Sequence, residues 1–420
     1  MKKRFLYAVM ALSVLSSAVF VSCDDDDDNL PPNKTKITVE NVTVTKDFVQ
    51  SGTFRGTAQQ TILPGESVSI TFYAGKGQAL MFATMYGYSN DLFFAPENPG
   101  IKLFDDTGKA ITGDVSTQVK LWDNGTRVNQ VPSSNVNHPG VATNENIKMV
   151  TTMDAQGNSY LLASQLMQLT LAYTETTSQF TLTIKNISGG TANETPFSPG
   201  VWAISNMLDG KLINDKPFFT PDEKSSDALT PLAEAGNITP LKTWLDTKTG
   251  VITGLSPVVV VIYSGSINPL FTVGEKDRAM GLKELAQTGS SATLKSKLGD
   301  LSYVKTVYVL GSSPIAPTGK VDAEIRYDAG DNIAYATMFG YSNDWFYANS
   351  ETIAANTNGD ITSKTRLYDN GTALDQYPGA GNSQALFNGT PIVEDKVISA
   401  VGNTFPVPAV NQIIKVSITQ

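Results

Sequence analysis

The feature that most constrains the fold of this chain is a stretch of sequence that occurs twice. Residues 83–95 read ATMYGYSNDLFFA and residues 336–348 read ATMFGYSNDWFYA, with ten of thirteen positions identical at an offset of 253. A second phrase follows each copy, VKLWDNGT at 119–126 and TRLYDNGT at 365–372. Repeats of this kind indicate related structural units. The sequence therefore predicts two domains built on the same aromatic strand and the same acidic turn.

The composition favours folded domains that are rich in strands. Of the 420 residues, 41% are hydrophobic and 17% are charged, which is typical of a chain that buries a core. Residues 37–43 and 182–188 alternate apolar and polar side chains as half-buried strands do, and we interpret them as the first strands of the two domains. Further strands are predicted at 68–72, 79–85, 166–173 and 412–418. Short strands separated by turn residues predict an all-β fold of two antiparallel β-sandwich domains.

The polar segment 174–178 predicts the boundary, which gives domain one at 36–178 and domain two at 179–420. Domain two also contains an internal duplication, in which PFFTPDEK at 217–224 matches PLFTVGEK at 269–276. Each copy is preceded by a strand-like phrase, SPGVWAI or SPVVVVI, and is followed by apolar residues at helical spacing. We therefore expect a small helical insertion in domain two, with two short helices in each copy and a glycine closing the first.

The beginning of the chain is typical of an exported, anchored protein. Residues 1–22 combine a basic start, an apolar run and a small final residue, as signal peptides do. Cys23, the sole cysteine, follows directly, which resembles the lipobox of bacterial lipoproteins, where the thiol receives a diacylglyceryl group. Lipidation would leave no thiol for a disulfide or for catalysis. The alternative is ordinary secretion with an unmodified cysteine.

An acidic run at residues 24–28 follows Cys23 at once. It resembles the surface-export signal of some bacterial lipoproteins, and the alternative is a solvated spacer that its like charges extend. With a proline pair behind it, the run would form an acidic tether that reaches residue 35. We expect a lipid-anchored protein at the outer membrane or cell surface, which makes the membrane a partner through the lipid.

The charge and the residue types argue against several functions. The net charge is −9, and loss of Lys2, Lys3 and Arg4 with the signal peptide would make it −12, whereas nucleic-acid binding needs clustered basic residues. The single histidine, His138, lies in an Asn-His-Pro-Gly loop. The sequence has no Gly-x-Ser-x-Gly elbow and no His or Cys cluster for zinc. Two carboxylates suffice for glycoside hydrolysis, but no pair stands out, so we expect a non-catalytic protein.

The doubled phrases, together with SPGVWAI and PLFTVGE–GLKELAQTG, resemble the spondin-N domain of F-spondin and of many bacterial secreted proteins. The fuller match covers most of 179–420. The match within 36–178 runs from the aromatic strand through the acidic turn and lacks the SPGVW-to-helix segment. The resemblance implies an antiparallel β-sandwich similar to calcium-dependent lipid-binding modules, a calcium site on loop acids, and a role in matrix or surface attachment.

The resemblance also implies which residues would hold calcium. They are Asp91 and Asp123 in domain one and Asp344 and Asp369 in domain two. The family's third acid would fall where this chain has Arg127 and Ala373, so the resemblance implies a weak calcium site. Calcium takes six to eight oxygen ligands, and further oxygens would have to come from neighbouring residues. The candidates are Asn90, Asn124, Asn343, Asn370, Asp114, Asp360 and Asp375.

Two alternatives need no metal. Asp-Asn-Gly-Thr is a strong turn sequence by itself, so the acids could serve only to set turns. Arg127 could also form a salt bridge with Asp123 or Asp91 and replace the cation in domain one.

We interpret the chain as a surface-anchored, non-catalytic adhesion or binding module that binds a surface, matrix or glycan ligand. The alternatives are a glycan-binding accessory protein for carbohydrate capture and a structural envelope component without metal. Several aromatic residues could stack on sugars if exposed, including Trp122 and Tyr368. Alternation along the strands predicts that Phe94 and Tyr347 are core residues. Trp202 is also expected in the core, and Tyr88 and Tyr341 at the surface.

Overall fold

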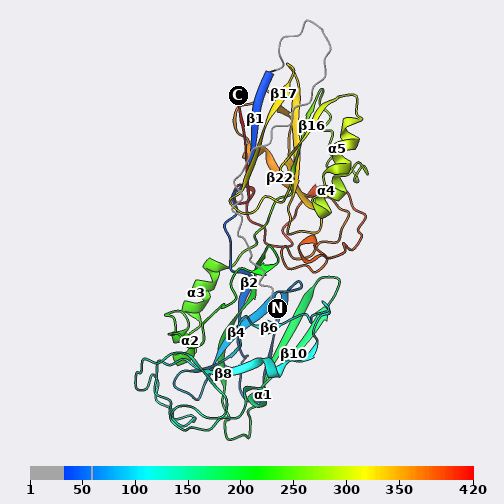
Figure 1. Cartoon of the computed structure of the whole chain (residues 1–420). Helices are drawn as coiled ribbons and strands as arrows, with labels where there is room; N and C mark the ends of the chain where they lie inside the picture. The colour runs from blue at the N-terminus through cyan, green and yellow to red at the C-terminus, as the bar shows by residue number, and fades with distance from the viewer. Residues whose placement is uncertain (1–32, 58–59) are drawn as a thin grey trace, which may run out of the picture.

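The computed structural model describes residues 33–57 and 60–420 and is all-β, with two antiparallel β-sandwich domains (Figure 1). In each domain a four-stranded sheet packs on a seven-stranded sheet. The predicted signal peptide, Cys23 and the acidic run at 24–28 lie outside the described residues. Within the described part of the chain, no helix is long and apolar enough to span a membrane.

The first domain uses strands from a continuous segment, residues 48–205. Its four-stranded sheet has the order β3 (Ser67–Tyr73), β11 (Gln179–Asn186), β10 (Met167–Thr174), β7 (Gly113–Asp114). Its seven-stranded sheet has the order β2 (Phe48–Phe54), β12 (Phe197–Ser205), β4 (Ala79–Tyr86), β5 (Leu92–Pro96), β8 (Val119–Asp123), β9 (Lys148–Val150), with β6 (Ile101–Lys102) paired to β4. A short hairpin, β13 (Met207–Leu208) and β14 (Lys211–Leu212), follows β12.

The second domain combines the first described strand of the chain with strands from its C-terminal part. Its four-stranded sheet has the order β17 (Lys320–Tyr327), β1 (Asn33–Asn41), β24 (Ile414–Thr419), β21 (Gly359–Asp360). Its seven-stranded sheet has the order β16 (Val304–Leu310), β15 (Val258–Tyr263), β18 (Asn332–Met338), β19 (Trp345–Asn349), β22 (Thr365–Asp369), β23 (Ser399–Ala400), with β20 (Ile353–Ala354) paired to β18.

The two domains correspond strand for strand, but the chain reaches two of the equivalent positions differently. β1 occupies in the second domain the place that β11 occupies in the first, between two antiparallel neighbours. β12 and β15 likewise occupy equivalent places beside the aromatic hairpin. Figure 1 shows β1, in blue, lying beside β17 near the C-terminus rather than with β2.

This pairing divides the chain elsewhere than at the boundary predicted between residues 178 and 179. Residues 37–43, predicted to begin domain one, belong mainly to β1 of the second domain, and residues 182–188 belong mainly to β11 of the first. The first domain is inserted into the second after β1. The two sequence repeats therefore do not coincide with the two folded domains, because each repeat contributes strands to the other domain.

Equivalent buried asparagines hold the exchanged strands in place. The Asn41 side-chain amide donates to the carbonyls of Thr253 and Ile315, at 2.9 Å each. The Asn186 amide donates in the same way to the carbonyls of Ile62 and Thr195, at 2.9 and 2.7 Å. A buried amide that satisfies two main-chain carbonyls fixes the end of a strand against loops of one domain. The repeated Asn therefore marks where each exchanged strand is anchored.

Helices cover the outer face of each seven-stranded sheet. They are α2 (Thr230–Ala235) and α3 (Thr239–Lys248) on the first domain and α4 (Leu282–Thr288) and α5 (Ala292–Gly299) on the second, while α1 (Ala163–Leu166) is a single turn before β10. β15 is buried along its whole length because one set of its side chains enters the sandwich and the other faces α4 and α5. Gly236 and Gly289, both with positive φ, end α2 and α4 as left-handed caps.

The predicted helical insertion is therefore shared between the domains. The first copy of the duplicated strand-and-helix segment covers the first domain, and the second copy covers the second. The segment that seemed to be missing from domain one in sequence is supplied by residues 197–248.

Candidate metal centre

The strand register of the second domain brings two acids to one end of its aromatic hairpin. Asp344 directly precedes β19, and Asp369 is the last residue of β22, where it is the register partner of Trp345. Adjacent antiparallel strands therefore place the two carboxylates beside each other. The same register brings Asp91 and Asp123 together in the first domain, where Leu92 pairs with Asp123.

The turn sequence holds one oxygen of Asp344 and leaves the other free. Oδ2 of Asp344 accepts hydrogen bonds from the main-chain N–H of Thr372 at 2.7 Å, from the Thr372 hydroxyl at 2.9 Å and from the N–H of Ala373 at 2.9 Å. Oδ1 is buried and has no hydrogen-bond partner among the described residues. Asp344 is fully buried. A buried carboxylate oxygen without a partner is costly unless a cation or a proton satisfies it.

A third carboxylate completes the cluster. Ligand oxygens of Asp344, Asp369 and Asp375 all lie within 4.8 Å of one another. The Trp345 indole N–H donates to Oδ1 of Asp375 at 2.6 Å, which fixes the orientation of that carboxylate. Asp375 lies six residues after the turn Asp and is one of the further oxygen donors suggested from sequence. The structure brings Asp375 together with the two predicted ligands.

The carboxylates of this cluster are buried and repel one another, which disfavours their charged forms. Burial, and then repulsion from Asp369, raises the pKa of Asp344 to about 7. Burial, and then repulsion from Asp369 and Asp344, raises the pKa of Asp375 to about 7. Burial also raises the pKa of Asp369. Glu394 adds negative potential: its buried Oε2 has no partner among the described residues, although Lys396 pairs with its other oxygen at 2.5 Å. Such a set of oxygens suits a hard divalent cation.

The equivalent position in the first domain carries an amide instead of a carboxylate. Asn129 lies six residues after Asp123, as Asp375 does after Asp369. Its amide donates to Oδ2 of Asp123 at 2.8 Å, so a neutral donor occupies the place of the third acid. Oδ1 of Asp91 is nevertheless buried without a partner among the described residues. Burial, and then repulsion from Asp123, raises the pKa of Asp91 to about 7.

Arg127 makes a different ion pair from the one considered on sequence. Its guanidinium pairs with Glu234 of α2 at 2.8 Å, and its main-chain N–H donates to Oδ2 of Asp91 at 2.8 Å. The expected side-chain bridge to Asp91 or Asp123 is not formed. The partner was hidden in the sequence because Glu234 lies on a helix that was assigned to the other domain. The second domain has Ala373 and Gln287 at the equivalent places, and Gln287 donates to the Thr372 hydroxyl at 3.0 Å.

Two predicted helper acids lie elsewhere. Asp114 and Asp360 are exposed residues on the short edge strands β7 and β21 of the four-stranded sheets. Each accepts a hydrogen bond from the N–H two residues later, Ser116 or Thr362, at 2.8 Å. Hydrogen bonds from the side chain of Ser116 or Thr362, and then from its main-chain N–H, lower the pKa of each acid. Asp114 and Asp360 therefore set turns, which is the role that the alternative without a metal gives to the four predicted calcium ligands.

The asparagines next to the acids also differ between the domains. Oδ1 of Asn124 accepts a hydrogen bond from the Ser225 hydroxyl at 2.6 Å, whereas Oδ1 of Asn370 is buried without a partner among the described residues. Asn90 and Asn343 instead accept the main-chain N–H of Gln130 and Gln376. Asn370 therefore adds one more free acceptor in the second domain.

The loop after Asp375 connects this cluster to the first domain. Gln376 donates to the carbonyl of Thr176 at 2.9 Å, and Gln78 donates to the carbonyl of Gly379 at 2.9 Å. Tyr341, which was expected at the surface, is buried, and its hydroxyl donates to the Met207 carbonyl at 2.9 Å. Phe94, Tyr347 and Trp202 are core residues as predicted.

The remaining chemically notable residues stand apart from the cluster. His138 is exposed in its loop, with Nδ1 3.2 Å from the carbonyl oxygen of Glu234. Trp122 and Tyr368 are buried against the helical layer and pack on Phe219 and Phe271. Their rings are therefore not open stacking platforms.

The sequence matches no protein-family model, and no curated protein matches it. The resemblance to the spondin-N domain rests on the repeated phrases alone.

Proposed function

We propose that this chain is a lipid-anchored, non-catalytic binding module of the cell surface whose second domain binds calcium. Asp344, Asp369 and Asp375 would be the protein ligands, with main-chain carbonyls and water completing the six to eight oxygens that calcium takes. In the first domain Asp91 and Asp123 would bind calcium more weakly or not at all, because Asn129 stands where the third carboxylate would be.

One observation carries the metal proposal: Oδ1 of Asp344 is buried and unpartnered beside two further carboxylates. None of the three acids forms a salt bridge within the described part of the chain. A turn former needs only the oxygen that accepts the N–H groups of Thr372 and Ala373. The turn alternative therefore explains Oδ2 of Asp344 but leaves Oδ1 unexplained.

The proposal of a surface role is supported by the sequence. The signal-like residues 1–22, Cys23 and the acidic run at 24–28 favour export and lipidation. Cys23→Ala should release the protein from the membrane fraction and abolish uptake of labelled lipid. A variant that stays membrane-bound, with no lipid taken up by the parent chain, would refute the anchor.

Calcium titration of the soluble chain 29–420 tests the metal site. This chain retains every described residue, including β1, whereas a fragment beginning at 179 would lack it. Binding to the folded state alone stabilises it by RT ln(1 + [L]/Kd). With a Kd on the order of 10⁻⁴–10⁻³ M, about 10 mM calcium should stabilise the second domain by about 1.4–2.7 kcal/mol. An unchanged melting curve with calcium, at a pH above 7, would exclude the site.

A second candidate function is carbohydrate capture. It is favoured by a separate pocket in the second domain, between the loop before α4 and the segment after β19.

A further inference from the structure

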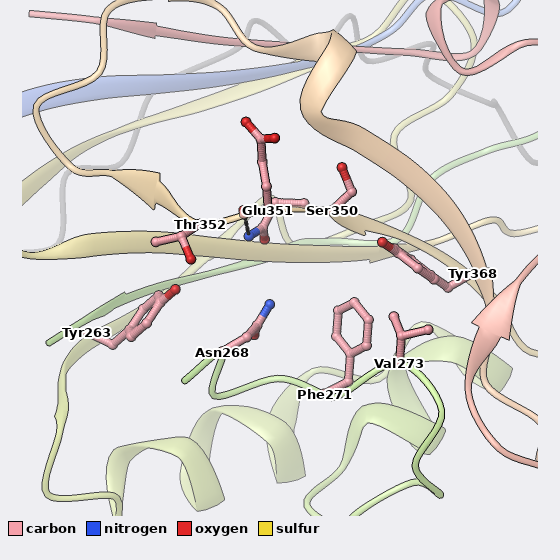
Figure 2. Close-up of a pocket in the computed structure, with 9 residues that line it drawn as sticks. Tyr263, Asn268, Phe271, Val273, Ser350, Glu351, Thr352 and Tyr368 are labelled. Atoms are coloured by element: carbon pink, nitrogen blue, oxygen red, sulfur yellow. Dashed lines mark hydrogen bonds between the residues drawn. The ribbon is translucent and has the colours of Figure 1, made fainter. Parts of the chain in front are cut away.

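Each domain has a pocket at the same place in its fold, away from the acidic turn. In the second domain a pocket of about 210 Å³ lies between the loop that carries Asn268 and Phe271 and the segment Ser350–Thr352 that follows β19 (Figure 2). In the first domain a pocket of about 650 Å³ is lined by Glu97, Asn98 and Trp122, with residues of the loop before α2.

The sequence repeats show that the two pockets are equivalent. Tyr368 and Trp122 hold the same position in TRLYDNGT and VKLWDNGT. Asn268 and Lys216 each directly precede the duplicated PLFT or PFFT phrase, and Glu351 and Asn98 each lie three residues after the alanine that ends the aromatic stretch. The hollow is thus a property of the fold, while the side chains that line it have diverged. The two pockets differ in volume, about 210 and 650 Å³, as well as in lining, so they are not expected to share a ligand.

The wall of the second-domain pocket is rigid and partly aromatic. Tyr263, Phe271 and Tyr368 are buried, and the rings of Phe271 and Tyr368 pack edge to face at 4.9 Å. A wall fixed by core packing loses little conformational entropy when a ligand binds. Because the three rings are at most 4% exposed, they set the shape of the wall and offer little open ring face, so a ligand would be held mainly by the polar groups around them.

The opposite side and rim supply hydrogen-bonding groups. Figure 2 shows the Asn268 amide and the Tyr263 hydroxyl directed toward the segment that carries Thr352. Oδ1 of Asn268 accepts the Leu270 N–H at 2.9 Å, which fixes the amide and leaves its NH₂ group with no recorded acceptor among the described residues. Ser350 also lines the pocket, and its hydroxyl donates to the Lys364 carbonyl at 3.0 Å. Hydrogen-bonding groups placed around a fixed wall match a small ligand that carries several hydroxyl groups.

Charge and size narrow the ligand class further. Among the described residues, Glu351 is the one carboxylic acid that lines the pocket, where it pairs with Lys364 at 2.7 Å, and no Lys, Arg or His lines it. An anionic ligand would find no cation there, so a neutral ligand is favoured. The pocket of about 210 Å³ is smaller than the roughly 300–1,000 Å³ typical of small-molecule sites, so it suits a ligand of about one ring.

We propose that the pocket formed by Tyr263, Asn268, Phe271, Thr352 and Tyr368 binds a single neutral sugar unit, such as a terminal hexose of a glycan. This site is distinct from the carboxylate cluster and does not depend on calcium there. The first-domain pocket is larger and is lined by Lys148, Lys216, Glu97 and Asp222, so it would not share this ligand.

Saturation-transfer NMR with methyl glycosides of glucose, galactose, mannose and N-acetylglucosamine tests the proposal on the chain 29–420. At least one neutral glycoside should give saturation transfer at about 10 mM, the range of weak single-ring ligands. Methyl glucuronoside, which adds a carboxylate, should give less. Absence of transfer from all four neutral glycosides, or stronger binding of the glucuronoside, would overturn the proposal.

Two variants and one control locate the binding. Val273 lines the pocket and is 56% exposed, so Val273→Trp should fill the pocket without disturbing the core and reduce affinity by about tenfold or more. Asn268→Asp keeps the acceptor for the Leu270 N–H but removes the NH₂ donor, and should also weaken binding. Ile267→Trp, at a neighbouring residue that is 65% exposed and does not line the pocket, should leave binding unchanged. Unaltered transfer in Val273→Trp would place the sugar elsewhere. Calcium titration reports separately on the metal site.

Discussion

The two acidic turns of this molecule differ mainly in how each accommodates a buried carboxylate. In both domains one oxygen of the first Asp accepts three hydrogen bonds from the turn, and the other oxygen has no partner among the described residues. The first domain places the amide of Asn129 against Asp123, whereas the second adds a further acid, Asp375. The comparison indicates that one position, six residues after the turn Asp, decides whether that Asp meets an amide donor or a further carboxylate.

The two domains also differ in how the chain reaches the exchanged strands β1 and β11. β11 lies within the continuous first domain, but β1 reaches its equivalent place from the far side of an inserted domain. The second domain therefore depends on residues separated from its remainder by about half the chain. The first domain does not.

The largest expected effect follows from that dependence. A fragment of residues 44–250 contains every strand of the first domain and should unfold cooperatively. A fragment of residues 179–420, the unit suggested by the sequence repeat, should not fold, because it lacks β1 with its buried Ile37 and Val39. Circular dichroism melting and NMR dispersion of the two fragments provide the test. A cooperative transition in 179–420 would contradict the strand exchange.

The paired asparagines test the exchange in the intact chain. Asn41→Ala removes the donors to two buried carbonyls and the acceptor of the Thr43 N–H, and leaving such groups unsatisfied costs about 1–3 kcal/mol each. Hydrogen exchange measured by peptide should rise in the second domain. Asn186→Ala is the matched variant and should raise exchange in the first domain. The opposite assignment would support the division at residue 178.

We expect the calcium response of each domain to depend on the residue six positions after the turn Asp. Asp375→Asn keeps an oxygen for the Trp345 N–H but removes the charge, as in the first domain, so it should abolish the stabilisation of about 1.4–2.7 kcal/mol at about 10 mM calcium. That stabilisation corresponds to a few degrees in Tm, at about 2–4 °C per kcal/mol. Calorimetry with and without calcium measures it. A calcium shift that persists in Asp375→Asn would exclude this acid as a ligand.

The reverse substitution tests whether the calcium site of the second domain can be built into the first domain. Asn129→Asp combined with Arg127→Ala and Glu234→Gln gives the first domain the residues of the second at all three places. The Glu234 change avoids leaving an unpaired acid where the Arg127 pair was. This variant should gain a calcium-dependent increase in Tm of the first domain. If calcium raises the Tm of the second domain but not that of the first, an acid six residues after the turn Asp is not sufficient to create a calcium site.

A further effect is expected from pH in the absence of calcium. The pKa of Asp344 and that of Asp375 rise from 3.8 to about 7 on folding, so the folded state binds more protons between these limits. Stability of the second domain should therefore fall as pH rises from about 4 to about 7 and then level off. Denaturant melts at several pH values, with Asp375→Asn as the variant that should flatten the slope, test this. Stability that increases over the same range would contradict the charge crowding.

Much of the fold followed from sequence because local patterns specify it. The alternation in 68–72 and 412–418 predicted β3 and β24, and glycines correctly marked the ends of α2 and α4. The partner of each strand could not be predicted in the same way. ITVENVT and LTIKNIS have the same pattern and suit either sheet equally well, so only tertiary packing, with Asn41 and Asn186 bound to different domains, assigns them.

The candidate site was predictable to a similar extent. The repeated Asp91, Asp123, Asp344 and Asp369 were brought together in pairs, because strand register follows from the repeated phrases. The role of Glu234 was not visible, since it depends on α2 covering the first domain. The burial that raises the pKa of Asp344 and Asp375 also depends on tertiary structure and has no local signal.

The smallest expected effect concerns the exposed edges of the two exchanged strands. On β1, Lys34 and Lys36 pair with Glu324 and Asp322 of β17, at 2.9 Å each and with all four side chains at least 41% exposed. On β11 the comparable contact is the 3.0 Å hydrogen bond between the hydroxyls of Ser69 and Thr183. Exposed ion pairs contribute about 0.2–1 kcal/mol and are screened by salt.

Glu324→Gln should therefore lower the free energy of unfolding of the second domain by less than about 1 kcal/mol in dilute buffer and by almost nothing in about 1 M salt. Ser69→Ala in the first domain should change stability by a similar amount at both salt concentrations, because a neutral hydrogen bond is not screened. Denaturant melts at the two ionic strengths distinguish the pair. A large loss of stability in Glu324→Gln that does not depend on salt would mean that the Lys34–Glu324 ion pair helps to hold β1 in place. The buried residues Ile37, Val39 and Asn41 would then not be sufficient to retain the strand.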